Sequence, residues 1–194
     1  MALASSRLTL VFELEEQGTE VQTKDLEEAL AALRDPTVTK LDVSQANFGD
    51  EDIEKIAEGL QHENCRVTNL NLNHNKISVA GVEHLVRALQ HKNCRVTNLN
   101  LNHNKIGVAG VEHLVRALQH ENCCVLTDLN LGENKIGDKG VEHLVRALQH
   151  ENCRVTGLDL NGNRISDEGA EHLSCALQHE NCRVTNLNLL GNKI

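Results

Sequence analysis

The chain is nearly without aromatic residues: its 194 residues include two Phe and no Trp or Tyr. Rings supply much of the buried area of an ordinary compact core, so their scarcity argues against such a core. Hydrophobic residues still make up 40% of the chain and charged residues 24%, a balance typical of folded proteins. A fold made of many similar aliphatic layers reconciles the two observations.

The chain also has no long apolar run, and none approaches the roughly 18–20 residues that a membrane span needs. The apolar stretch at residues 8–12 is too short for the core of a signal peptide, and Glu13, Glu15 and Glu16 follow it at once. The Asn-x-Ser/Thr pattern of glycosylation sites is absent as well. We therefore expect a cytoplasmic protein that has no membrane partner.

Positive charge is scarce at the start of the chain. Residues 1–63 hold 15 Asp and Glu against 5 Lys and Arg, whereas residues 64–194 hold 13 against 14. The net charge of −9 therefore belongs to the first third, which we interpret as a solvated acidic cap. A nucleic acid is not expected as a partner, because that affinity depends on Lys and Arg neutralising phosphates.

A repeat of 29 residues organises the rest of the chain. Residues 64–92 and 93–121 are identical at 27 of 29 positions. Self-similarity at such a period indicates a solenoid, in which each unit packs only against its neighbours. The period is carried by a Leu-x-Leu pair, which recurs at Leu70/Leu72, Leu99/Leu101, Leu129/Leu131, Leu158/Leu160 and Leu187/Leu189, with Leu41/Val43 as a diverged first copy.

One unit predicts a strand, a turn and a helix. Polar residues flank the two leucines, as in a strand with one buried face. Further along the unit, apolar residues fall on one helical stripe. Asn93, after this helix, fits a left-handed C-cap. The stripe consists of Val82, Leu85, Val86 and Leu89.

The first 35 residues depart from the repeat. Residues 7–14 alternate as a strand does, and Asp25 with Glu28 resembles the capping box of a helix that runs to about Arg34. Pro36 then breaks the chain. We expect an N-terminal cap at 1–35, made of a strand and a helix, and repeats at 36–194 with six strands and an incomplete last unit.

The motif L-N-L-N-H-N-K-I resembles the leucine-rich repeat consensus L-x-L-x-x-N-x-I/L. The 29-residue length, the helix and the Cys before each strand resemble the ribonuclease-inhibitor-like class, and NOD-like receptors and the Ran GTPase-activating protein carry related arrays. This resemblance implies an α/β fold: a right-handed horseshoe solenoid with a parallel sheet on its concave face and helices on its convex face.

Three rows of identical residues recur in the repeats. In the family, the Asn75 row points inward and bonds backbone groups; Ala46 replaces it in the first copy, which should hold its turn less firmly. The row of Cys65, Cys94, Cys124, Cys153 and Cys182 suits small buried reduced side chains, and Cys175 should be exposed. We interpret the abundant His residues as polar groups on helix surfaces.

No enzyme motif, metal-binding spacing or cofactor fingerprint is found. We expect neither catalysis nor a cofactor nor a metal. The leading hypothesis is a non-catalytic module that binds a protein partner. A structural or self-assembling array, or a GTPase-activating regulator, is the alternative.

Leucine-rich repeats usually bind partners on the concave face, where the residues that flank each Leu-x-Leu should project. Six strands give a footprint of about 350 Å², below the roughly 800 Å² per side of a standard interface, so strong binding needs loops or an edge as well. The C-terminal end carries exposed leucines, so we expect either self-association through this edge or a longer array. The candidate partner-binding residues are Asn71, His74, Asn100, His103, Asp128, Asn130, Glu133, Asp159, Asn188 and Leu190.

Overall fold

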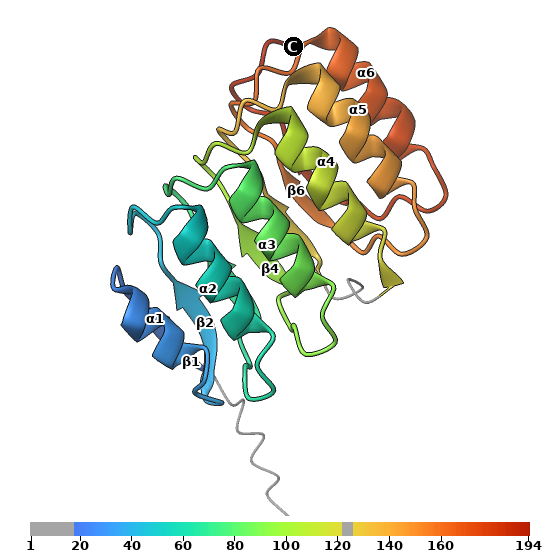
Figure 1. Ribbon diagram of the computed structural model, residues 1–194. Helices are drawn as coiled ribbons and strands as arrows, with labels where there is room; N and C mark the ends of the chain where they lie inside the picture. Colours follow the sequence, from blue (N-terminus) through green and yellow to red (C-terminus); the bar gives the residue numbers. More distant parts are fainter. Residues whose placement is uncertain (1–17, 122–125) are drawn as a thin grey trace, which may run out of the picture.

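The computed structural model describes residues 18–121 and 126–194. In these ranges seven strands alternate with six helices along the chain (Figure 1). The strands are β1 (Thr19–Gln22), β2 (Val38–Asp42), β3 (Asn69–Asn71), β4 (Asn98–Asn100), β5 (Asp128–Asn130), β6 (Gly157–Asp159) and β7 (Asn186–Asn188). The helices are α1 (Leu26–Ala32), α2 (Asp50–Leu60), α3 (Val79–Leu89), α4 (Gly107–Leu118), α5 (Gly137–Leu148) and α6 (Asp167–Leu177).

All seven described strands form one parallel sheet in chain order. The helices lie side by side along one face of this sheet, and the array curves from the first repeat to the last (Figure 1). Equivalent residues of neighbouring repeats lie opposite one another in the sheet: Leu70 lies opposite Leu99, and Leu99 lies opposite Leu129. The predicted α/β leucine-rich repeat solenoid is thereby confirmed.

The core is a stack of aliphatic layers between the sheet and the helices. Both leucines of each Leu-x-Leu pair are buried from β3 to β6. The predicted helical stripe is confirmed in α3, where Val82, Leu85, Val86 and Leu89 are all less than 10% exposed. Phe48, at 6% exposure, is the one aromatic ring buried in the described chain. Stacked aliphatic side chains therefore do the packing that rings do elsewhere.

An asparagine in each turn joins neighbouring repeats. The Asn104 Nδ2 group donates to the Leu101 carbonyl of its own repeat and to the Leu72 carbonyl of the preceding one, both at 3.0 Å. Its Oδ1 atom accepts from the Ile77 backbone N–H, also in the preceding repeat. Asn75, Asn134, Asn163 and Asn192 bond in the same way. The inward-pointing role that the family resemblance implied for this row is confirmed.

A second set of asparagines links the loops that return from helix to strand. The Asn93 side chain donates to the Gln61 carbonyl of the preceding repeat at 2.9 Å. Asn152 and Asn181 donate in the same way to Gln119 and Gln149. The prediction of a left-handed cap at Asn93 is wrong: helix α3 is capped by Gln90 with φ −84°, and the Asn93 side chain satisfies a carbonyl instead.

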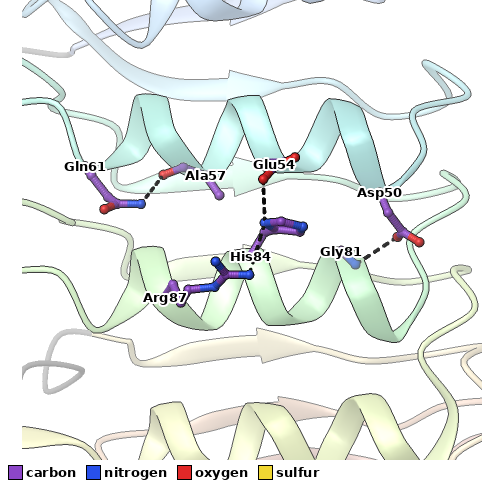
Figure 2. Close-up of polar contacts among 7 residues, drawn as sticks. All are labelled: Asp50, Glu54, Ala57, Gln61, Gly81, His84 and Arg87. Carbon is purple, nitrogen blue, oxygen red and sulfur yellow. Dashed lines mark hydrogen bonds and ion pairs between the residues drawn. The ribbon is translucent and has the colours of Figure 1, made fainter.

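Aspartates on two helices cap the next helix in the array. The Asp50 carboxylate accepts hydrogen bonds from the backbone N–H groups of Ser78 and Gly81, at 2.8 and 3.0 Å (Figure 2). Asp138 contacts Ser166 and Gly169 with the same geometry. These hydrogen bonds also hold the pKa of Asp138 below its ordinary value.

Where Val replaces this aspartate, the next helix begins differently. Val79 and Val108 occupy the aspartate position, and Gly107 and Gly137 then replace the serine with φ of +61° and +62°. A valine offers no acceptor to the next helix, so its first turn begins from a left-handed glycine instead. The chain therefore pairs Asp with Ser and Val with Gly in consecutive repeats.

The first described elements extend the same array. Strand β1 pairs with β2, and α1 is capped by Asp25, whose carboxylate accepts from the Glu28 N–H at 2.9 Å, as the sequence predicted. The strand expected at residues 7–14 lies outside the described residues. The division into a cap at 1–35 and repeats at 36–194 stays a prediction.

Replacing Asn163 with Ala should lower the free energy of unfolding by about 2–4 kcal/mol, because it removes the partners of several buried turn groups. Asn163 is fully buried, whereas Asn186 is exposed. Urea unfolding of Asn163→Ala, with Asn186→Ala as the matched control, measures the difference. Equal losses in both variants would contradict the asparagine ladder as the source of stability.

Replacing Asp138 with Ala should lower the free energy of unfolding by about 1 kcal/mol at neutral pH, because helix α6 loses its cap. The folded-state pKa of Asp138 is lowered from 3.8, so its contribution is complete above that pH and disappears as the pH falls through the folded value. Urea unfolding between about pH 7 and pH 3 measures this convergence of variant and wild type. Asp167→Ala, at the same position of the next repeat, is the control. An equal loss in this control, or a loss in Asp138→Ala that does not change with pH, contradicts the cap.

Candidate functional site

A groove of about 810 Å³ crosses the sheet on the face that the helices leave free. Residues from all seven described strands line it, from Glu20 on β1 to Asn188 on β7. Short strands in register place the polar residues beside each leucine in rows across this face. The groove is open to a partner along its whole length.

The charges of the groove lie on four of its strands. Its charged lining residues are Glu20 on β1, Lys40 and Asp42 on β2, Asp128 on β5 and Asp159 on β6. Strands β3, β4 and β7 contribute amides beside the leucines. Uncharged amides therefore separate the carboxylates of β1 and β2 from those of β5 and β6.

Hydrogen bonds orient the central amides. The Oδ1 atoms of Asn71, Asn100 and Asn130 accept from the backbone N–H two residues further on, at 2.9 to 3.1 Å. Asn98 likewise accepts from the Thr97 hydroxyl at 2.7 Å. In this orientation the Nδ2 groups of these side chains can donate to a ligand, and each oxygen keeps a second lone pair that can accept.

The predicted site residues divide into two groups. Asn71, Asn100, Asp128, Asn130, Asp159 and Asn188 line the groove. His74, His103 and Glu133 are not lining residues: they lie in the turns after the strands, in left-handed backbone. The His74 and His103 rings stack there with centroids 3.9 Å apart. Leu190 is 76% exposed in the last turn. The partner-binding role of all ten residues stays a prediction.

Three charged groove residues were not among the predicted ones: Glu20, Lys40 and Asp42. Lys40 and Asp42 flank Leu41, so the diverged first Leu-x-Val pair carried the signal. Glu20 belongs to strand β1, which was not predicted.

On the helical face, histidines link neighbouring helices. The His84 Nδ1 atom lies 3.6 Å from Glu54 on α2 (Figure 2). His113 Nε2 lies 3.2 Å from Glu83 on α3. The His side chains are only 20% and 25% exposed. These side chains are therefore partly buried against the neighbouring helix. In the sequence, each contact is marked by a Glu one residue before the position of the preceding repeat that aligns with the His.

Three of the five described thiols are buried. Cys65, Cys94 and Cys153 are buried, as predicted, and desolvation raises the pKa of Cys94 to about 11. Cys175 is exposed, as predicted, and Cys182 is half-buried; Cys124 of the same row lies outside the described residues. Among the described residues, no three His, Cys, Asp or Glu side chains converge as metal ligands. None of the described helices has the length and apolarity to cross a membrane.

The fold and the regular rows define a repeat protein, and comparison with known families agrees. The model of the leucine-rich repeat family matches residues 34–57, 63–86, 92–115, 122–145 and 151–174. These segments cover more than half of the chain, which therefore belongs to the leucine-rich repeat family. No curated protein sequence matches the chain.

Two solved structures resemble the chain to different degrees. A structure described as leiomodin-1 actin-binding site 2 superposes with a TM-score of 0.62 at 21% identity, covering 78% of this chain and 87% of that one. An internalin from Listeria monocytogenes gives a TM-score of 0.47 at 18% identity, covering 86% of this chain and 44% of that one. The first likeness extends to the fold alone.

Proposed function

We propose that the chain is a non-catalytic module that binds a protein partner in the groove of its sheet. One observation carries this proposal: a continuous groove of about 810 Å³ that residues from all seven described strands line. Leucine-rich repeat proteins generally mediate protein–protein interaction, which supports the same class of function. The leiomodin fragment is named an actin-binding site, and that activity belongs to that protein.

The groove chemistry narrows the partner to a segment that presents carbonyl oxygens and basic side chains. Amide donors from Asn71 and Asn100 suit backbone carbonyls, and the carboxylates of Asp128 and Asp159 suit Lys or Arg. Because the described lining contains no aromatic ring, recognition depends on hydrogen bonds and charge.

The same proposal includes a subclass and a compartment. The ribonuclease-inhibitor-like subclass is supported by the 29-residue unit and by helices of 11 or 12 residues from α2 onward. A cytoplasmic location is supported by buried, unpaired thiols such as Cys65 and Cys94, which suit a reducing compartment.

The groove is tested by reversing its charge. Asp128→Lys with Asp159→Lys should weaken capture of a lysate partner about tenfold or more, because two attractions become repulsions. Quantitative mass spectrometry of captured proteins measures this loss. Glu58→Lys with Glu151→Lys, two exposed carboxylates outside the groove, is the control with the same change of charge.

A partner captured equally by wild type, groove variant and control would place the interaction elsewhere and overturn the proposal. Asp159 also accepts hydrogen bonds from Asn161 and Asn188, so its replacement affects folding as well. Among the described residues, the wild-type Asp128 side chain accepts a hydrogen bond only from the neighbouring Thr127 hydroxyl. The single variant Asp128→Lys therefore separates lost binding from lost stability.

Self-association through the C-terminal edge is a second candidate. It is favoured by a group of exposed apolar side chains around β7 and the end of α6: Leu177 at 41%, Leu190 at 76% and Ile194 at 60% exposure. If these side chains meet a second copy, the mass measured by light scattering should rise with concentration, and Leu190→Glu should abolish the rise. A constant monomer mass at tens of micromolar rejects this candidate.

A further inference from the structure

A row of basic side chains runs along the turns between the strands and the helices. Each repeat from the second onward has a cation between its buried turn asparagine and a following isoleucine, as in Asn75-Lys76-Ile77. All five cations are exposed. We call this surface the basic rim, and it consists of Lys76, Lys105, Lys135, Arg164 and Lys193.

The basic rim has no partner inside the described chain. None of its five side chains makes an ion pair or a hydrogen bond with another described residue; Lys76, Lys105 and Lys193 donate only from their backbone N–H groups to neighbouring turns. By contrast, Arg116 and Arg146 on the helices pair with the Glu four residues earlier. The rim charges are thus not used to hold the repeats together.

Two of these cations also occupy unfavourable backbone. Lys135 and Arg164 have φ of +59° and +64°, in the left-handed region, where a long side chain is less stable than Asn or Gly. In the first repeat this position is Asn47, with φ +63°. Folding alone therefore favours asparagine at this turn, and the cations occupy it at a cost in stability. Lys135 and Arg164 thus combine strained backbone with side chains that make no ion pair or hydrogen bond with another described residue, and this combination points to binding.

We propose that the basic rim binds an acidic polypeptide segment in extended conformation. Neighbouring strands are roughly 5 Å apart and neighbouring helices roughly 10 Å apart. The distance between successive rim residues, which lie between strand and helix, falls between these two values. An extended chain presents every second side chain about 7 Å further along, so alternate Glu or Asp residues match this spacing. The rim lies outside the groove lining, apart from the surface of the proposed function.

The charge around the rim favours a peptide over a nucleic acid. The protein carries a net charge of −9, and the neighbouring groove adds the carboxylates of Asp128 and Asp159. A polyanion as wide as a nucleic acid meets these charges as well as the rim. A single extended strand of polypeptide is narrow enough to contact the rim alone.

The test uses fluorescence anisotropy of a labelled oligoglutamate peptide. Wild type should bind it, and the affinity should fall steeply between about 0.1 M and 1 M salt as the charges are screened. Lys135→Asn with Arg164→Asn should weaken binding about three- to tenfold. The same variant should keep its melting temperature or gain about 1–3 °C, because Asn relieves the left-handed backbone. Loss of binding without loss of stability distinguishes a binding role from a structural one.

Arg116→Gln with Arg146→Gln is the matched control, since it removes two positive charges from the helical face. It should change the affinity by less than about twofold. An equal loss in this control overturns the proposal in favour of a net-charge effect. Absence of binding by wild type overturns it outright. Tighter binding of a single-stranded oligonucleotide of equal charge overturns the assignment to a polypeptide.

Discussion

The structure depends on the need to satisfy the backbone groups of buried turns. Each turn leaves carbonyl and N–H groups away from water, and one asparagine per repeat meets them from the next layer. Asn163, for example, accepts from the N–H groups of Asn134 and Ile136 and donates to the Leu131 carbonyl. A buried group left without a partner costs about 1–3 kcal/mol, so each repeat is stable only beside its neighbour. This contact holds the repeats in one register.

Because the ladder positions are committed to folding, other positions are free to vary. The residues beside the leucines face the groove, and they change from Asn98 to Asp128 to Gly157 in adjacent strands without disturbing the sheet. The helix starts vary in pairs: an aspartate on one helix accompanies a serine at the start of the next, and a valine accompanies a glycine. Variation at the free positions can therefore carry specificity while the scaffold stays constant.

The scarcity of aromatic residues has consequences for both core and surface. In the core, repeated leucine layers replace rings, and the buried side chains of one repeat pack on those of the next. On the surface, the absence of Trp and Tyr removes the residues that most often dominate protein interfaces. The proposed binding therefore depends on amides and carboxylates in the groove and on the cations of the basic rim, and salt screens the charged groups among them.

Periodicity predicted the repeat length, the alternation of strand and helix and the buried stripe of α3, since a pattern repeated every 29 residues has few ways to bury its leucines. The inward role of the Asn75 row was implied by the resemblance to leucine-rich repeats. The tertiary structure alone decided which side chains meet: the bond from Asn93 to Gln61, the His84–Glu54 contact and the exclusion of His74 and Glu133 from the groove lining. Such contacts join residues about one repeat apart, and the left-handed turns that aim His74 and Glu133 depend on backbone angles that composition does not encode.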